Sequence, residues 1–165
     1  MNLRQKIQQD LQKALKNQEK SRLSILRLAW DAIIKKEKEK RILLNGKIEE
    51  SKINQESELT EQELIQLFFY LVKKGKEAVL QFEKGNRDDL AKKEQAEVEI
   101  LKEYLPEQLK EDEVQKIAQE VIEKIGAQSL KDMGKVMGIL MSKTQGQISG
   151  DMASSIVKKL LSPDA

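Results

Sequence analysis

Few residue types in this 165-residue chain could carry out catalytic chemistry. The chain contains no histidine and no cysteine, so it has no imidazole base and no thiol nucleophile. Catalysis would depend on carboxylates, Lys, Ser, Thr or Tyr, and these residues form no recognisable catalytic motif. The phosphate-binding patterns GxxxxGK[ST] and GxGxxG are also absent. We therefore expect no catalytic residues, no metal and no cofactor.

A group of acidic residues in the middle of the chain is the one pattern that resembles a carboxylate metal site. It consists of Glu94, Glu97, Glu99 and Glu103. On a helix this spacing scatters the four side chains around the axis, and Lys92, Lys93 and Lys102 lie beside them. Such neighbours typically form surface ion pairs. We expect a charged helix surface here and not a metal site.

The segment from 129 to 152 is the strongest candidate for a contact surface. Its apolar residues keep a helical period: Leu130, Met133, Val136, Met137, Leu140 and Met141. Gly134 and Gly138 interrupt this pattern and share one face, because they are four residues apart. A glycine inside a helix costs about 0.5–1 kcal/mol relative to alanine. Two interpretations remain open: another helix packs closely against the glycines, or a non-protein backbone such as RNA approaches them.

Basic residues accompany the two glycines. Lys131 and Lys135 lie beside them, Lys143 follows within two turns, and Gly146 lies in a loop whose backbone amides could contact a phosphate. The candidate RNA-binding residues are therefore Lys131, Lys135, Lys143, Gly134, Gly138 and Gly146. The alternative is that the lysines are simply the solvated edge of a helix.

The elements that must position these residues are all predicted to be helical. Apolar residues at a 3.6-residue period predict N-terminal helices over about 2–17, 20–41, 60–84 and 87–105. Thr60 and Glu63 form a capping box for the third of these helices. The polar stretch from 45 to 58 predicts a mobile loop. The short Gly85-Asn86 connection predicts an antiparallel pair.

Pro106 ends the fourth helix and begins the predicted domain boundary. Beyond it, three shorter helices are expected over about 111–125, 130–142 and 149–161, with Gly126 as a C-terminal cap. The predicted fold is all-α. An N-terminal elongated helical hairpin or bundle, 1–106, precedes a small C-terminal three-helix domain, 107–165.

Charge is distributed unevenly along the chain. Residues 1–47 contain thirteen Lys or Arg against five Asp or Glu, a net of +8, whereas residues 48–63 have a net of −5 and residues 107–165 a net of −1. The basic region could attract a polyanion, with the acidic segment as an internal competitor. The chain has no run of 18 apolar residues, and residues 1–10 lack an apolar signal core. We expect a cytoplasmic protein without a membrane segment.

Two stretches resemble a known family. Asp132-Met-Gly-Lys-Val-Met-Gly-Ile-Leu-Met141, followed by a lysine, Gly146 and Asp151, resembles the tail of the GatB/YqeY family. That tail is the C-terminal module of the B subunit of tRNA-dependent amidotransferases. Asn86-Arg-Asp-Asp-Leu90, Glu94, Glu97 and Tyr104-Leu-Pro-Glu-Gln-Leu109 are similar to the stand-alone YqeY-like proteins, which carry the tail without the catalytic part of the B subunit.

The resemblance implies a non-catalytic accessory module of translation. Its partner would be tRNA, or a complex of tRNA with an amidotransferase or an aminoacyl-tRNA synthetase. A second hypothesis is a protein-interaction adaptor, favoured by the near-neutral tail and its methionines. A third, implied only by association with the family, is a carbon–nitrogen ligase with glutamine as amido-N-donor. The chain shows no apparatus for activating a carboxylate or releasing ammonia. The missing catalytic groups therefore favour a protein that is not an enzyme.

Overall fold

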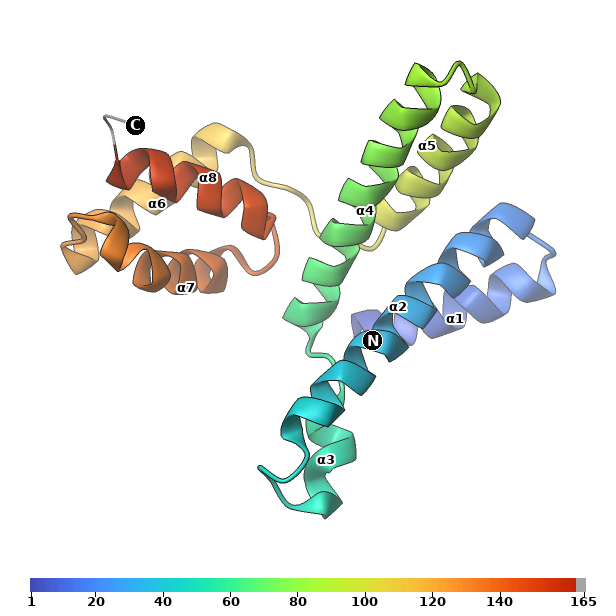
Figure 1. Cartoon of the computed structure of the whole chain (residues 1–165), viewed down its shortest axis with the longest axis horizontal. Coiled ribbons are helices and arrows are strands. Elements are labelled where there is room, and N and C mark those ends of the chain that lie inside the picture. Colours follow the sequence, from blue (N-terminus) through green and yellow to red (C-terminus); the bar gives the residue numbers. More distant parts are fainter. Residues whose placement is uncertain (163–165) are drawn as a thin grey trace. The chain divides into compact units, whose positions relative to one another are not determined.

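The computed structural model describes residues 1–162, and its regular elements are all helices (Figure 1). In chain order they are α1 (Leu3–Lys16), α2 (Lys20–Leu44), α3 (Glu50–Ser57), α4 (Glu61–Lys84), α5 (Asp88–Lys102), α6 (Glu111–Ile125), the short 3₁₀ helix η1 (Leu130–Asp132), α7 (Met133–Thr144) and α8 (Gly150–Leu161). The expectation of an all-α fold is confirmed. Contacts group these elements into unit 1, residues 1–105, and unit 2, from residue 106 onward.

Unit 1 begins with a hairpin of α1 and α2 (Figure 1). Asn2 and Gln5 form a capping box that starts α1. The two helices bury Ile7, Leu26 and Ile33, which are fully inaccessible to solvent. Both helices occupy nearly the ranges that their apolar periodicity predicts.

The expected loop between residues 45 and 58 is wrong in part, because residues Glu50–Ser57 form the helix α3. This helix packs on α2 and buries Ile53. A single buried isoleucine in eight residues leaves no periodic pattern in the sequence. Contact with α2 therefore supplies the stabilisation that short isolated helices lack.

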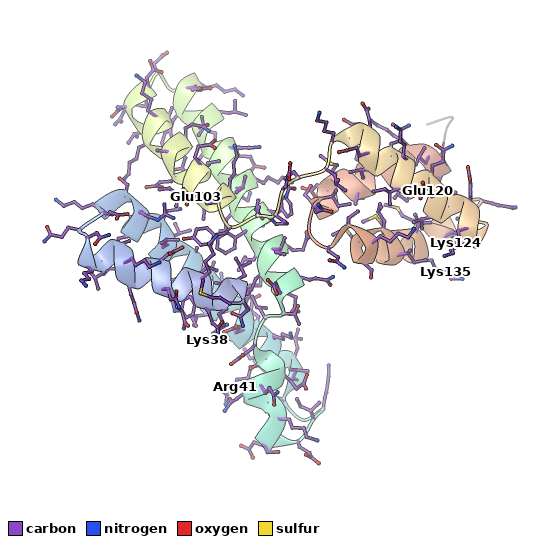
Figure 2. All side chains as sticks on the ribbon, turned by 180° about the vertical axis from the view of Figure 1, so that it is seen from behind. Lys38, Arg41, Glu103, Glu120, Lys124 and Lys135 are labelled. Carbon is purple, nitrogen blue, oxygen red and sulfur yellow. The ribbon has the colours of Figure 1, made fainter. Side chains whose placement is uncertain are left out.

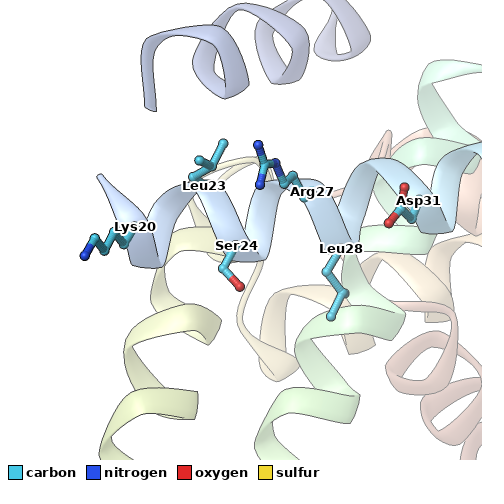
Figure 3. A pocket seen from close by; sticks show the side chains of 6 residues that line it. All are labelled: Lys20, Leu23, Ser24, Arg27, Leu28 and Asp31. Atoms are coloured by element: carbon cyan, nitrogen blue, oxygen red, sulfur yellow. The ribbon is translucent and has the colours of Figure 1, made fainter. Parts of the chain in front are cut away.

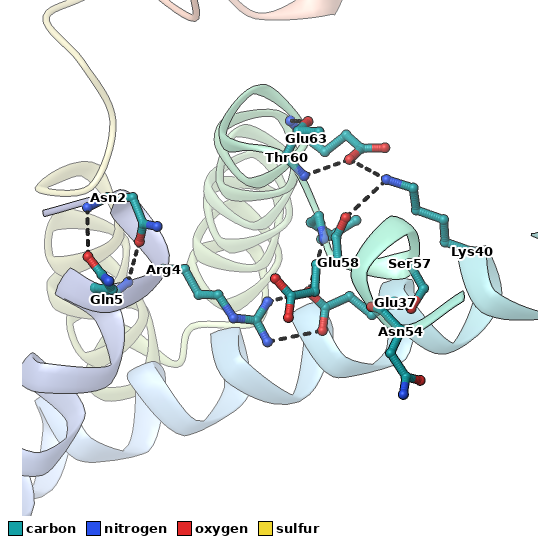
Figure 4. Close-up of polar contacts among 11 residues, drawn as sticks. Asn2, Arg4, Gln5, Glu37, Lys40, Asn54, Ser57, Glu58, Thr60 and Glu63 are labelled. Atoms are coloured by element: carbon teal, nitrogen blue, oxygen red, sulfur yellow. Dashed lines mark hydrogen bonds and ion pairs between the residues drawn. The ribbon is translucent and has the colours of Figure 1, made fainter. Parts of the chain in front are cut away.

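Polar contacts tie the end of this connection to α1 and α2 (Figure 4). The guanidinium of Arg4 forms a bidentate pair with the Glu37 carboxylate. The same carboxylate accepts a hydrogen bond from the backbone N–H of Leu59, at 3.0 Å. One glutamate on α2 thus holds both the first helix and the chain entering α4.

The capping box that opens α4 is also linked to α2. As expected, the Thr60 hydroxyl accepts from the backbone N–H of Glu63, and the Glu63 carboxylate accepts from the backbone N–H of Thr60. The ammonium of Lys40 donates to Glu63 at 2.8 Å and to the Glu58 carbonyl at 3.1 Å (Figure 4). Burial raises the pKa of Glu63, but the hydrogen bonds from Lys40 and Thr60 outweigh it and lower the pKa overall.

Helices α4 and α5 form the expected antiparallel pair (Figure 1). The two helices are in tight contact at Gly75, where an added Cβ would lie 2.4 Å from Cγ2 of Val98. No side chain larger than hydrogen fits there without displacing the buried valine. Gly75 therefore lets the two helices pack closely.

Helix α5 ends at Lys102, before the end that Pro106 predicts. The chain turns because Tyr104 packs into the core of unit 1, where its ring centroid lies 5.4 Å from that of Phe68. Its hydroxyl donates a hydrogen bond to Asp10 at 2.9 Å. A buried contact between distant residues, not the proline alone, ends the helix.

Unit 2 is built from α6, α7 and α8, each of which contacts the other two. Its core consists of side chains that are nearly or fully buried: Val114, Ala118, Val121, Val136, Leu140, Ile148, Ala153, Ile156, Val157 and Leu161. Gly126 ends α6 in the left-handed conformation, at φ +66°. This confirms its prediction as a C-terminal cap.

Candidate nucleic-acid interface

One side of α7 is open to solvent along its length. Val136 and Leu140 are fully buried on the opposite side. Gly134, Gly138 and Lys135 are exposed. At 3.6 residues per turn these three lie within an arc of about 100°. We call this surface, with Ser142, which is also exposed on the same arc, the α7 face.

The α7 face is not covered by another helix in the part of the chain that the structure describes. A Cβ added to Gly134 or Gly138 would meet no atom within 4 Å. The close-packing interpretation of these glycines is therefore wrong. The glycine with that role is Gly75 on α4, which the sequence did not single out because it lies in a long, otherwise regular apolar pattern.

The three candidate lysines are exposed, but they do not all share one surface. Lys131, in η1, and Lys135 lie at the start of the α7 face. Lys143 is about 80° further around the axis than Lys135. None of the three forms an ion pair with a residue in the described part of the chain. Lys124, at the end of α6, lies at the same end of unit 2 as Lys135 (Figure 2).

The start of the α7 face is held by a polar cap. The Ser129 hydroxyl accepts a hydrogen bond from the backbone N–H of Lys131. The Asp132 carboxylate accepts from the backbone N–H groups of Gln128, at 3.1 Å, and Ser129, at 3.3 Å. These hydrogen bonds, with the nearby charge of Lys135, lower the pKa of Asp132. The only acid in η1 is thus committed to backbone groups.

Gly146 lies apart from the α7 face. It is buried, with φ +84°, in the turn between α7 and α8. The preceding residue, Gln145, is also left-handed, and the backbone N–H of Gln147 donates to the Thr144 carbonyl at 2.8 Å. Glycine adopts this conformation without steric cost. The position of Gly146 is that of a turn residue and not of a surface contact.

The methionines of unit 2 are not a free contact surface. Met133, Met137, Met141 and Met152 are partly buried and pack against the core. They fill gaps between the helices, a common use of this flexible side chain. The apolar residues that remain exposed near α7 are Leu130 and Ile139, at 45% and 37% exposure. Sequence periodicity did not single out Ile139 or Ser142 as exposed residues of α7.

Within residues 1–162, no group of three or more acidic side chains is placed to hold a metal ion. No helix in this part of the chain has both the length and the apolar content needed to cross a membrane.

Comparison with known proteins gives one family. The profile of the family described as Yqey-like protein matches residues 4–161, which is nearly the whole chain. No curated protein matches the chain. This match covers all the helices except the first residue of α1, and the chain therefore belongs to the family of Yqey-like proteins.

Proposed function

We propose that this protein is a non-catalytic accessory module of translation. In this proposal the α7 face binds tRNA, free or carried by an amidotransferase or an aminoacyl-tRNA synthetase. The observation that carries the proposal is the exposed pair Gly134 and Gly138, with space above both glycines.

The two glycines of the α7 face lower the stability of the helix that carries them. Gly138 lies inside α7 and Gly134 in its first turn, and together they lose up to about 1–2 kcal/mol relative to alanines. At Gly75 close packing offsets such a loss, but at Gly134 and Gly138 no contact within the described chain does so. A strip without side chains is useful where a second backbone must approach the helix closely. The sugar–phosphate chain of RNA is such a backbone.

The neighbouring charges fit the same ligand. Lys131 and Lys135 are exposed beside the glycines and free of ion pairs with described residues. Residues 107–165 contain no aromatic residue, so base stacking is not available. Recognition would rest on phosphates and on the shape of the RNA backbone. The net charge of −1 in this segment makes the α7 face by itself a weak RNA ligand.

The first experiment changes the shape of the α7 face. Gly138→Leu places a bulky side chain where the structure has open space, so the fold should persist while tRNA binding weakens at least tenfold. Circular dichroism reports the fold, and fluorescence anisotropy with labelled tRNA reports binding. Unchanged affinity in a folded Gly138→Leu protein would contradict the proposal.

The second experiment changes its charge. Replacing Lys131 and Lys135 by Ala should flatten the log–log salt dependence of tRNA binding by about 1.8, at about 0.9 per phosphate contact. The matched control replaces Lys116 and Lys158, exposed lysines of α6 and α8, and should leave the slope unchanged. Equal effects of the two pairs would indicate unspecific attraction. The adaptor hypothesis would then replace RNA binding.

A further inference from the structure

The exposed side of α2 in unit 1 carries a row of charged residues. Lys20, Arg27, Lys35 and Lys38 are all exposed. At 3.6 residues per turn they fall within an arc of about 80°, together with Ser24 and Asp31. We call these six residues the α2 basic face. It spans about 27 Å along the helix, at 1.5 Å per residue.

The cations of this face are free of internal partners. Several other basic residues of α1 and α2 are paired: Arg4 with Glu37, Arg22 with Glu103, Lys36 with Glu39 and Lys40 with Glu63. Lys20, Arg27, Lys35 and Lys38 form no ion pair with any residue among 1–162. No acidic residue of the segment 48–63 forms an ion pair with this row, although the segment follows α2 in the chain.

Part of the face is hollowed. A groove of about 560 Å³ is lined by Lys20, Leu23, Ser24, Arg27, Leu28 and Asp31. Leu23 and Arg27 lie along one edge and Ser24 and Leu28 along the other (Figure 3). The groove exposes the charged groups of Lys20, Arg27 and Asp31 together with apolar surface from Leu23 and Leu28. Its two cations, in line with Lys35 and Lys38 along the helix, suit an elongated polyanion.

We propose that the α2 basic face is a second nucleic-acid surface, which binds the phosphate backbone of duplex RNA without regard to sequence. This surface is separate from the α7 face, because α2 belongs to unit 1. It also supplies the positive charge that residues 107–165 lack.

The residues favour a duplex over a single strand and over a membrane. The only aromatic residue of α2, Trp30, is half-buried, and Arg4 lies over its ring at 5.1 Å. The face therefore offers no platform for unstacked bases. A helix that lies on a lipid surface needs an exposed apolar face. The apolar face of α2, with Ile25 and Leu26, is buried in the core of unit 1. The exposed apolar residues of α2 are Leu28, Ile42 and Leu43, and they form no continuous face, because Leu28 lies about 21 Å along the helix from Ile42, at 1.5 Å per residue.

The test uses the full chain and a labelled 20-base-pair RNA duplex of arbitrary sequence, between 50 and 200 mM KCl. Changing Lys20, Arg27, Lys35 and Lys38 to Gln should flatten the log–log salt slope by about 3–4, at about 0.9 per phosphate contact. Between 50 and 200 mM KCl, these four contacts therefore account for about a 100-fold loss of wild-type affinity. The control changes Lys76, Lys84, Lys92 and Lys93 of α4 and α5, which are also exposed.

A variant of opposite sign guards against unspecific damage. Asp31 is exposed between Arg27 and Lys35 on the same face. Asp31→Asn removes its repulsion of phosphate and should tighten duplex binding about two- to fivefold, since one charge pair at 4 Å in water is worth about that factor. Unchanged or weaker binding by a folded Asp31→Asn protein would count against the proposal.

The remaining outcomes separate this inference from the proposed function. The inference is overturned if the quadruple variant keeps the wild-type slope, or if the control loses as much. It is also overturned if the quadruple variant changes only binding to phosphatidylserine vesicles, which would indicate a membrane surface. The Lys131/Lys135 pair, measured on the same duplex, reports on the α7 face alone, so either surface can fail while the other stands.

Discussion

Two substitutions of the same kind, glycine to alanine in a helix, should have opposite effects on this protein. At Gly134 and Gly138 the new Cβ would meet no described atom within 4 Å. The double change to alanine should therefore gain only the helix propensity term, about 1–2 kcal/mol in total. At Gly75 the new Cβ would lie 2.4 Å from Cγ2 of Val98.

The size of the Gly75→Ala effect follows from the rigidity of its neighbour. Val98 is 1% exposed and β-branched, so it has no free rotamer into which to move. Overpacking of this kind costs about 1–3 kcal/mol. The propensity gain of alanine offsets about 1 kcal/mol of that cost. We expect a net loss of up to about 2 kcal/mol.

Urea denaturation measures the free energy of unfolding of each variant. Hydrogen exchange with mass spectrometry then shows whether protection changes in α7 or in the α4–α5 pair. A loss of stability in Gly134→Ala/Gly138→Ala would refute the open α7 face, and a gain in Gly75→Ala would refute the close helix packing. If the α7 face binds RNA, the stabilised alanine pair should also bind tRNA more weakly, a trade of stability against function.

Three further predictions concern unit 1 and the connection that follows it. Burial and the hydrogen bond to Asp10 raise the pKa of Tyr104 to about 12. The folded state therefore favours the neutral phenol. This stabilisation is complete below pH 10 and is lost between pH 10 and 12. Melting temperatures over that range should fall more steeply for the wild type than for Tyr104→Phe, and parallel curves would contradict the assignment. Thr60→Ala should lower the unfolding free energy by about 1 kcal/mol, because it removes the N-cap of α4; an unchanged urea midpoint would count against that role. Limited digestion with a glutamate-specific protease should cut early after Glu107, which is exposed and outside the helices; cleavage within the helices while Glu107 stays intact would argue against a domain boundary there.

Most of the helices could be predicted from local patterns. Apolar residues at helical spacing, the Thr60–Glu63 capping box and the Gly126 cap are signals within one or two turns, and the structure has these elements where expected. The helix α3 was missed because its stabilising contact is with α2, which no local pattern reports. The end of α5 was misplaced for a similar reason, since Tyr104 reaches Asp10 from far along the chain.

The candidate site divides in the same way. The sequence alone determined that Gly134 and Gly138 share a face with Lys135 beside them, because helical periodicity follows from spacing. Whether that face is covered depends on residues distant in the chain, and only the tertiary structure decided that it is open. Packing within unit 2 also buries Gly146 and partly covers the methionines, and packing within unit 1 makes Gly75 the glycine of close contact. Spacing defines which residues share a side of a helix, but only its neighbours determine what that side touches.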